Sequence, residues 1–411
     1  MNDLETVAAV ASGVPLRYRL AAKLVLAPLL RWTGGAVTLS LPDGTVREVG
    51  DRTAAPPVTV AVRDWKFFWR VLTAGDIGVG ESYMAGEWQC SDLVELCRCF
   101  VRDQSMLRYR SPWTLPARWW HALLRRTRAN TLAGSRRNIQ YHYDLSNDLY
   151  RLFLDESMTY SCAIFEPAEV SLEDAQQQKI DQICRRLRLA PGLEVLEIGS
   201  DWGTFAIHAA RSYGCRVTSL TLSDQQLQLA RARVVAAGLA SSVDVRLCDY
   251  RQMTGRFDRV VSIEMFEAVG YEHYGAFFGQ CSRLLKPDGR MLLQTITMRD
   301  QRFDEYRRDF DWIRKYIFPG SLLASVAAIA RALKEHTDLR IEWMREIGPY
   351  YARTLRCWRE RFLRQLPAVR ALGFDERFIR MWEFYLASCE AGFSTRYIGD
   401  VQIELAKPAA S

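Results

Sequence analysis

Two short stretches of the sequence carry residue types that could do chemistry. One, at 197–203, reads EIGSDWG and places glycines after an apolar run and before a helical pattern. Glycines let the backbone approach a ligand, and the N-terminus of the following helix offers free N–H groups. The other stretch holds Glu264 and Glu267, a carboxylate pair at the end of the apolar run 259–266. Both therefore have the composition of a ligand site at the carboxyl edge of a parallel sheet.

The residues around the glycine turn discriminate between nucleotides. The dinucleotide pattern GxGxxG is absent. At 221–226 the sequence reads TLSDQQ, where dinucleotide-binding proteins place an acid for the ribose. The third apolar run ends in CDYR (248–251), an acidic and aromatic pair suited to the edge and face of adenine. The set favours S-adenosylmethionine, with an ordinary strand-to-helix turn as the alternative.

Strands that alternate with helices must position these residues. Short apolar runs predict five strands, at 193–199, 216–223, 244–249, 259–266 and 290–297, with helical patterns between them. Two more strands, near 339–347 and 397–405, could complete the sheet, and 298–338 reads as an aromatic, charged helical insertion. The alternation predicts an α/β fold with a parallel sheet covered on both faces.

The first 105 residues have a different pattern, which predicts a small α+β domain. Alternating runs in AVTLSLPDG and VTVAVRD are typical of strands, and SDLVELCRCFVRD predicts a helix capped by Ser91 or Asp92. A length of 411 residues fits two or three domains. We therefore expect an N-terminal α+β domain at 1–105, a basic, aromatic linker at 106–137, and the main domain at 138–411.

The positive charge of the chain is concentrated in that linker. The net charge is +7, and 108–137 contains eight arginines and no acid, so the rest of the chain carries −1. Tyr109, Trp113, Trp119 and Trp120 are interleaved with these arginines. Basic and aromatic residues together suit single-stranded nucleic acid or an anionic lipid surface. The third interpretation of this segment is a linker that is only exposed to solvent.

Several classes of protein are excluded by composition. Hydrophobic residues make up 49% of the chain and can bury a large core, so disorder of the whole chain is excluded. No apolar stretch approaches the ~18–20 residues of a membrane span. The first residues, MNDLET, lack the basic region of a secretory signal. Ten cysteines show no zinc-ligand spacing, which predicts reduced thiols, no metal site and a cytosolic protein.

Taken together, the motifs resemble the cyclopropane-fatty-acyl-phospholipid synthase family, which includes the mycolic acid cyclopropane synthases. The resemblance covers about 138–407, through YHYDLSNDLY, MTYSCAIFEP, VLEIGSDWGTFA, TLSDQQ, SIEMFEAVG, LLQTIT, YIFPG and YYARTL. GESYMAGEW in the first domain looks like the longer bacterial members. The resemblance implies a Rossmann-like, seven-stranded methyltransferase sheet. It also implies transfer of a methyl group from S-adenosylmethionine to the cis double bond of an unsaturated acyl chain in a phospholipid, giving a cyclopropane.

The resemblance further implies which residues form the site. The carbocation left by methylation would lose a proton to a bound bicarbonate ion, held by backbone contacts of Cys162 and Ile296 and by the side chains of Glu267 and Tyr351. The cofactor contacts fall on four segments, at Tyr160, Ser161, Gly199, Trp202, Gly203, Thr221, Gln226 and Tyr250. From the residues alone, Cys162 is expected to be a buried structural thiol and Tyr351 to pack in the core.

Two residues depart from the family pattern. The family's histidine, 27 residues after the glutamate, is Gln294 here, which could still hold bicarbonate but moves no proton at neutral pH. The middle glycine of the cofactor loop is Asp201, whose carboxylate could crowd or repel the methionine end of the cofactor. Because of Gln294, C-methylation without ring closure is an alternative to cyclopropane synthesis. Because of Asp201, a lipid-binding pseudoenzyme is a second alternative.

An acyl-chain substrate in a bilayer makes an anionic membrane surface the preferred partner of the arginine-rich linker. Each base near such a surface contributes about 1 kcal/mol, so eight suffice for reversible docking. We expect a cytoplasmic, peripheral enzyme on the inner leaflet, with no nucleic-acid partner. The insertion at 298–338 is expected to form part of an acyl tunnel, and a homodimer is left open.

Overall fold

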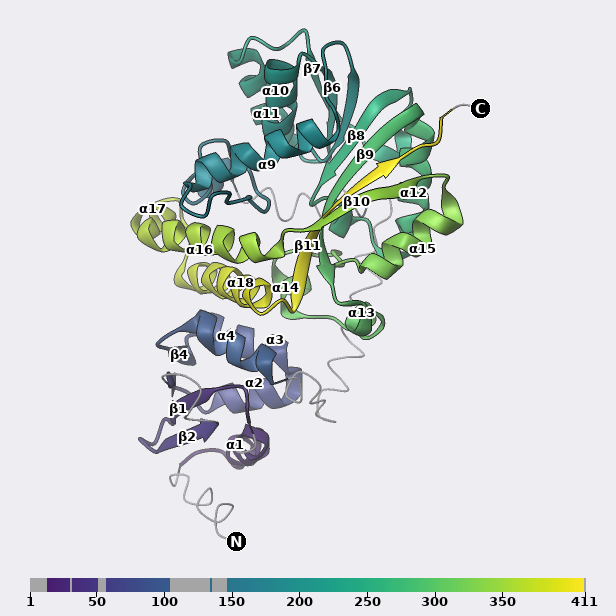
Figure 1. The fold of residues 1–411 in the computed structure, drawn as a ribbon. Coiled ribbons are helices and arrows are strands. Elements are labelled where there is room, and N and C mark those ends of the chain that lie inside the picture. Colours follow the sequence, from purple (N-terminus) through teal and green to yellow (C-terminus); the bar gives the residue numbers. More distant parts are fainter. Residues whose placement is uncertain (1–12, 30–31, 51–56, 104–133, 135–145, 410–411) are drawn as a thin grey trace. The chain divides into compact units, whose positions relative to one another are not determined.

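The chain divides into two compact units. The computed structural model describes residues 13–29, 32–50, 57–103, 134 and 146–409 (Figure 1). The first unit contains the N-terminal part of the chain together with 309–316 and 366–397. The second contains 125–308, 317–365 and 398–411. Each unit thus combines segments that are far apart in the sequence.

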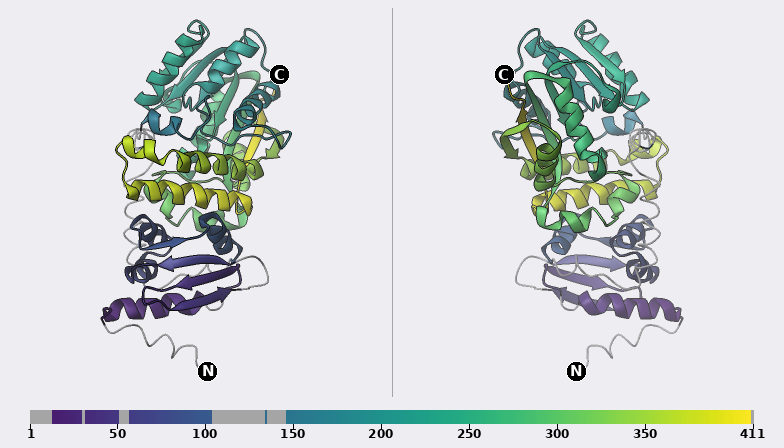
Figure 2. Two further views of the ribbon diagram at one scale, coloured as in Figure 1. Left: turned by 90° about the vertical axis from the view of Figure 1, so that its left-hand side faces the viewer. Right: turned by 90° about the vertical axis from the view of Figure 1, so that its right-hand side faces the viewer.

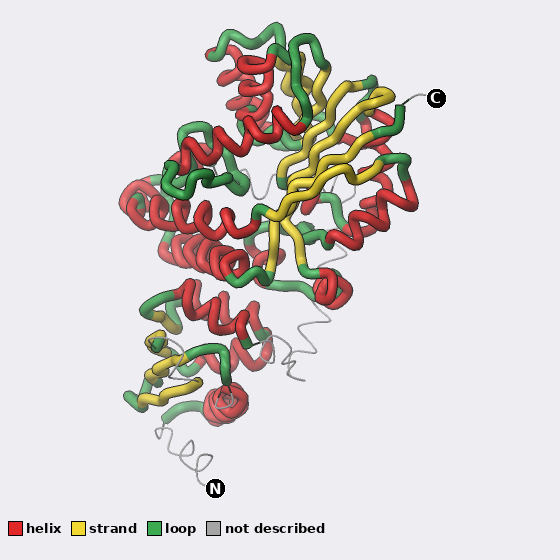
Figure 3. Tube along the Cα trace, viewed as in Figure 1, coloured by secondary structure: helices red, strands yellow, loops and turns green. Residues whose placement is uncertain are grey.

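A seven-stranded sheet forms the centre of the second unit; its strands are yellow in Figure 3. The strand order is β10-β11-β9-β8-β5-β6-β7. The bounds are β5 (Glu194–Ile198), β6 (Arg216–Thr221), β7 (Val243–Leu247), β8 (Phe257–Ile263), β9 (Leu285–Met298), β10 (Arg340–Glu346) and β11 (Ile398–Ala406). Strands β5 to β9 pair in parallel, whereas β11 is antiparallel to both β9 and β10. The predicted seven-stranded α/β fold is confirmed.

Helices cover this sheet on both faces. They are α8 (Asn147–Arg151), α9 (Leu172–Arg186), α10 (Thr204–Tyr213), α11 (Asp224–Ala236), α12 (Tyr274–Leu284), α13 (Asp300–Tyr306), α15 (Val326–His336) and α16 (Gly348–Arg364). Val195 and Leu292 pack into a core with α9, α10 and α11. Their strand neighbours Leu196 and Leu293 pack into a second core with α12 and α15. Successive side chains of a strand point to opposite faces, so β5 and β9 each present apolar side chains to both faces.

The first unit contains a four-stranded sheet of order β2-β1-β3-β4, seen from two sides in Figure 2. Its strands are β1 (Ala36–Ser40), β2 (Val46–Gly50), β3 (Val58–Val62) and β4 (Trp88–Cys90). Its helices are α1 (Leu16–Leu29), α2 (Lys66–Ala74), α3 (Asp76–Met84), α4 (Leu93–Arg102), α14 (Trp312–Tyr316), α17 (Leu366–Ala371) and α18 (Glu376–Ser394). Asp92 caps α4 by accepting a hydrogen bond from the Glu95 amide, as one of the two predicted caps.

Helix α18 is an integral part of this first unit, although it lies near the C-terminus of the sequence. The Tyr83 hydroxyl on α3 donates a 2.8 Å hydrogen bond to Glu383 on α18. The rings of Trp312 and Phe384 are 4.8 Å apart and nearly perpendicular, at 69°. The predicted helical insertion 298–338 is therefore divided, since α14 belongs to the first unit and α13 and α15 to the second.

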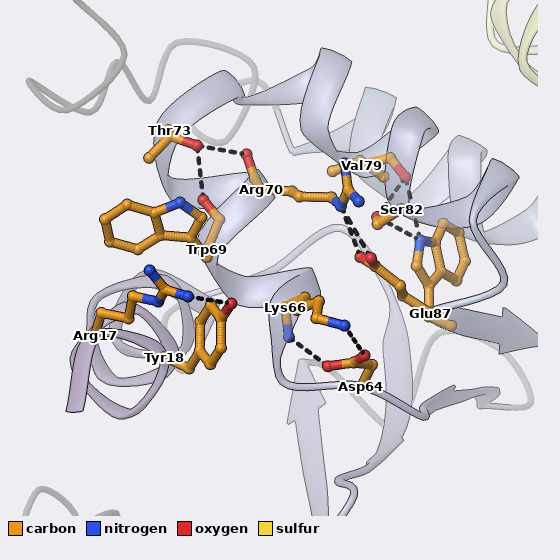
Figure 4. Close-up of polar contacts among 11 residues, drawn as sticks. Arg17, Tyr18, Asp64, Lys66, Trp69, Arg70, Thr73, Val79, Ser82 and Glu87 are labelled. Atoms are coloured by element: carbon orange, nitrogen blue, oxygen red, sulfur yellow. Dashed lines mark hydrogen bonds and ion pairs between the residues drawn. The ribbon is translucent and has the colours of Figure 1, made fainter. Parts of the chain in front are cut away.

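A buried carboxylate joins two parts of the first unit. The Arg70 guanidinium on α2 donates from Nε to both oxygens of Glu87, at 2.9 and 3.0 Å (Figure 4). The next residue, Trp88, donates its indole N–H to the Val79 carbonyl and to the Ser82 hydroxyl. These contacts hold α2 and α3 against the strand β4.

The arginine-rich linker lies outside the described residues except for Gly134, so the boundary predicted at 106–137 stays a prediction. Within the part of the chain that the structure describes, no helix is both long and apolar enough to cross a membrane.

Candidate active site

The glycine turn after β5 has the backbone geometry that the sequence predicted for a ligand loop. Gly199 has a φ of +100° and Gly203, the N-cap of α10, a φ of +84°, both in the region that favours glycine. A Cβ on Gly199 would lie 3.0 Å from the Met265 side chain. The turn therefore packs directly on the segment between Glu264 and Glu267. Among the described residues no side chain caps α10, which leaves amides of its first turn available to a ligand.

A chain of hydrogen bonds joins this turn to the start of α11. The Thr221 hydroxyl donates to the side-chain oxygen of Gln226 at 2.7 Å. The amide nitrogen of Gln226 donates in turn to Asp201 at 3.4 Å. Asp201 adopts a φ of +43°, so an aspartate does keep the turn at the position of the family's glycine. Desolvation raises the pKa of Asp201 to about 7, against the opposing charge of Lys179.

Aromatic side chains pack beside the turn. The Trp202 ring is fully buried, 5.0 Å from that of Tyr150, and its indole N–H donates to Asn147 at 2.7 Å. Tyr160 packs against Tyr150 and Trp358, with ring centroids 5.3 and 5.2 Å away. The predicted cofactor residues Trp202 and Tyr160 thus share one aromatic cluster.

Ser161 and Tyr250 complete the predicted cofactor set. The Ser161 hydroxyl accepts a 2.7 Å hydrogen bond from Lys179 on α9, whose ammonium is almost fully buried. Burial lowers the pKa of Lys179, opposed by the charge of Glu264. Tyr250 follows β7 and packs edge-on against Phe277, at 5.2 Å. The donors, glycines and rings of these segments fit an adenosyl and methionyl ligand.

The second half of the site is centred on Glu264, at the carboxyl end of β8. Its Oε1 accepts hydrogen bonds of 2.8 Å from the Cys162 backbone N–H and 2.8 Å from the Gln294 side-chain amide. Its Oε2 accepts a 2.6 Å hydrogen bond from the Tyr351 hydroxyl. Three of the groups predicted to hold bicarbonate therefore converge on one carboxylate of the chain itself.

Glu267 lies one turn further, in the short helix Phe266–Ala268. Its Oε1 accepts from the Ile296 backbone N–H at 2.5 Å and from the Thr295 hydroxyl at 3.0 Å. Its other oxygen, Oε2, is buried and has no hydrogen-bond partner among the described residues. Burial, with the nearby charge of Glu264, raises the pKa of Glu267 to about 8. At neutral pH Glu267 is therefore mainly protonated.

A third carboxyl group, Asp400 on β11, belongs to the same cluster. It is completely buried, and the Gln294 amide nitrogen lies 3.5 Å from its Oδ2. Burial and the neighbouring charge of Glu264 raise the pKa of Asp400 well above its ordinary value. Over the described residues, no group of histidines, cysteines and acids could hold a metal ion.

The Cys162 side chain takes no part in this anion site. Its thiol is buried and points to the carbonyls of Ala163 and Ile347, at 3.3 and 3.6 Å. Burial, with the charges of Asp400 and Glu264, raises the pKa of the thiol well above its usual value. Cys162 thus contributes its backbone N–H to Glu264, whereas the resemblance implied a backbone contact to bicarbonate.

The sequence indicated Glu264 only as one of a carboxylate pair. Three further residues of the site were not predicted. Asp400 lies in DVQIELA, a stretch that reads as an alternating strand with solvated acids. Lys179 lies in an amphipathic helix, where a lysine is ordinarily exposed. Asn147 belongs to YHYDLSNDLY, a motif of the resemblance whose individual contacts no pattern assigned.

Comparisons with known proteins agree with this architecture. Residues 131–403 match the family model of mycolic acid cyclopropane synthetase. A tuberculostearic acid methyltransferase of Mycobacterium tuberculosis is 43% identical over 383 residues, covering 90% of this chain and 88% of the relative. The cyclopropane-fatty-acyl-phospholipid synthase of Escherichia coli is 38% identical over 353 residues, covering 84% and 86%. The solved mycolic acid cyclopropane synthase complexed with SAH and CTAB is 34% identical with a TM-score of 0.62, covering 66% of this chain and 98% of that one.

The sheet order, the glycine turn after β5 and the carboxylates after β8 define a Rossmann-like, S-adenosylmethionine-dependent methyltransferase. The chain belongs to the mycolic acid cyclopropane synthetase family. The resemblance drawn from the motifs is thereby confirmed, while the role of each site residue stays a prediction.

Proposed function

We propose that this protein transfers a methyl group from S-adenosylmethionine to the cis double bond of an unsaturated acyl chain in a phospholipid. The observation that carries the proposal is the contact between the cofactor turn and the carboxylate cluster, since Gly199 packs on Met265, between Glu264 and Glu267. The cofactor supplies a methyl group on a sulfonium. An alkene is a poor nucleophile, so the alignment of the two reactants provides most of the acceleration.

The carboxylate cluster has the chemistry that the second half of such a reaction needs. Addition of a methyl cation to an alkene leaves a carbocation, and a base must remove a proton before a stable product forms. Glu264, Glu267 and Asp400 are three neighbouring acids; burial keeps Glu267 mainly protonated at neutral pH and raises the pKa of Asp400 well above its ordinary value. We assign this cluster to proton transfer and the segments around Gly199 to the cofactor.

Two products are compatible with this chemistry. The resemblance implies a cyclopropane, formed when the base removes a proton from the added methyl group and the ring closes. Gln294, which stands where the family has histidine, favours a methyl- or methylene-branched chain without ring closure. The 43% identity to a relative named as a tuberculostearic acid methyltransferase supports the same alternative.

Lipid analysis of cells that express the chain tests the proposed function. A cyclopropane and a methylene branch both add CH₂ to the acyl chain, so mass alone does not separate them, whereas proton NMR does. Upfield ring protons identify a cyclopropane, and olefinic protons of a terminal methylene identify the branched product. Unaltered acyl chains in expressing cells, with purified protein inactive on unsaturated phospholipid vesicles, would refute the proposal.

A pseudoenzyme is the candidate from another class, because Asp201 replaces a glycine of the cofactor loop. Calorimetric titration with S-adenosylmethionine separates the two. Saturable binding with one site per chain supports the enzyme. Such binding is the expected result, because Asp201 adopts a φ of +43° and so keeps the turn. Absence of heat at any concentration supports the pseudoenzyme.

We further propose that the protein acts as a peripheral enzyme on an anionic membrane surface of the cytoplasm. The support is the run of eight arginines at 108–137 and a substrate that resides in a bilayer. Flotation with liposomes tests the idea: binding should require phosphatidylglycerol and weaken as salt is raised. Equal binding to neutral vesicles would contradict it. The N-terminal unit as a lipid-presenting module and the insertion 298–338 as part of an acyl tunnel belong to the same proposal.

A further inference from the structure

The donors expected to hold bicarbonate already have an anion. The Cys162 N–H, the Gln294 amide and the Tyr351 hydroxyl all donate to the Glu264 carboxylate, at 2.8, 2.8 and 2.6 Å. A carboxylate and a bicarbonate ion present the same planar, negatively charged O–C–O group. A second anion at these donors would compete for the same hydrogen atoms and would be repelled by the first. The site as built therefore does not fit bicarbonate.

Gln294 is held in the orientation that serves this carboxylate. The Gln402 amide donates a 3.0 Å hydrogen bond to the side-chain oxygen of Gln294, so the Gln294 nitrogen must face Glu264. The backbone provides a further link, because the Glu264 N–H donates to the Gln294 carbonyl at 2.8 Å. Glutamine at this position is thus matched to a carboxylate that belongs to the chain.

We propose that the Glu264 carboxylate takes the place of bicarbonate and accepts the proton released after methyl transfer, so that the reaction needs no added anion; this rests on the proposed function. Glu264 is partly exposed, unlike the fully buried Gln294. The electron pair of a C–H bond of the added methyl group forms the new ring bond. In the branched product, a hydride shift first moves the positive charge to the carbon that carries the added methyl group. The electron pair of a C–H bond of that methyl group then forms the C=C bond. In either case the proton passes to Glu264 and then to solvent.

Turnover in carbonate-free buffer tests the proposal with two variants. Glu264 has a φ of +49°, so Glu264→Gly introduces no backbone strain and opens the space that the carboxylate fills. Wild-type turnover should be the same with and without bicarbonate. Glu264→Gly should lose about 100-fold or more in carbonate-free buffer, the usual scale for a lost general base, and recover at least about tenfold when bicarbonate is added. Glu264→Gln should stay inactive under both conditions, because its amide fills the site without being a base.

A binding measurement keeps the proposal testable independently of turnover. In NMR titrations with ¹³C-bicarbonate, Glu264→Gly should broaden the carbonate signal and wild type should not. Glu272→Gln, an exposed substitution in the same loop region, serves as the matched control and should behave as wild type in every assay.

The possible outcomes distinguish a failure of the role of Glu264 from a failure of the proposed function. Wild-type turnover that collapses without bicarbonate, an active Glu264→Gln enzyme, or wild-type protein that binds ¹³C-bicarbonate would overturn the role of Glu264. Wild-type protein that methylates no unsaturated phospholipid in any buffer would instead refute the proposed function. In that case the ¹³C titration still decides whether Glu264 occupies the anion site.

Discussion

Gln402 and Gln294 face each other across β11 and β9, where they are opposite partners in the antiparallel register and are joined by a 3.0 Å hydrogen bond. Both side chains are buried. The pairing exists because β11 enters the sheet between β9 and β10. Strand β11, far from the site in sequence, therefore fixes the orientation of an amide in the site.

Gln402→Leu should destabilise the protein and disturb Glu264. The substitution leaves the buried side-chain oxygen of Gln294 without a donor, which costs about 1–3 kcal/mol. The amide can then rotate and present its oxygen to Glu264, a repulsive contact. Urea unfolding should show the loss of stability, and turnover should fall. A variant with wild-type stability and turnover would show that Gln402 does not fix the amide.

Glu267→Gln should abolish product while the affinity for S-adenosylmethionine stays close to that of wild type. Glutamine keeps an oxygen to accept the hydrogen bonds from Ile296 and Thr295, so the fold is retained. It removes the carboxyl group whose pKa is about 8. Turnover and calorimetry measure the two effects separately, with Glu272→Gln as the control. Unchanged turnover would count decisively against the assignment of this residue.

Asn147→Ala should weaken cofactor binding. The buried indole N–H of Trp202 loses its acceptor at 2.7 Å, at a cost of about 1–3 kcal/mol. Trp202 lies in the turn 199–203, so its displacement reaches the predicted cofactor site. Asn147→Asp keeps an acceptor and should bind S-adenosylmethionine like wild type. If both variants bind equally weakly, the hydrogen bond to Trp202 is not the cause.

Stability should fall as the pH rises from about 5 to 8, and Glu197 should account for part of the slope. Burial raises the pKa of Glu197 from 4.5 to about 8. In that window the folded state keeps a proton that the unfolded state has released, so the free energy of unfolding decreases by about 1.4 kcal/mol per pH unit and group. Glu197→Gln keeps the acceptor for Ser219, its partner in the β5–β6 register, and should remove this contribution.

Unfolding midpoints measured in urea between pH 5.5 and 7.5 provide the test. Glu194→Gln is the matched control, because Glu194 lies on the same strand but is only partly buried and is paired with Arg216 and Lys286. Its slope should equal that of wild type. Equal slopes for all three proteins would contradict the assignment to Glu197.

A shortened chain that lacks residues 1–103 should aggregate or bind hydrophobic dyes. Helix α18 packs with α3 and α4 in the first unit, through contacts such as Tyr83 with Glu383 and with Phe384. Removal of these partners exposes the apolar face of α18, and large exposed apolar surfaces promote association. Dye fluorescence and size-exclusion chromatography measure the effect. A monomeric, dye-negative product would show that 366–397 needs no N-terminal partner.

The sequence was sufficient to predict strands β5 to β9, because each contains a short apolar run, and β5 and the second half of β9 are buried on both faces. It was also sufficient for the cap of α4, where Asp92, one of the two predicted residues, accepts from the Glu95 amide. The neighbours of β11 were not predictable, since an apolar pattern indicates that a strand is buried but not which strands it pairs with.

The site was predicted in its parts but not in its connections. Glu264 and Glu267 stood out because they follow an apolar run, and the resemblance supplied Cys162 and Tyr351. That these side chains meet at Glu264 depends on contacts between residues about 100 positions apart, which no local pattern encodes. Asp400 was missed because its burial follows from the position of β11 between two other strands.

The place of α18 has a consequence for how the protein emerges from the ribosome. Helices α3 and α4 are complete when residue 102 has been synthesised, yet their partner helix ends at Ser394. At about 5–20 residues per second, the apolar surfaces that await it stay uncovered for some tens of seconds. The whole second unit, apart from β11 and the last residues, is translated in that interval. The nascent first unit thus depends on late translation, and a chain truncated before α18 should be a substrate for chaperones.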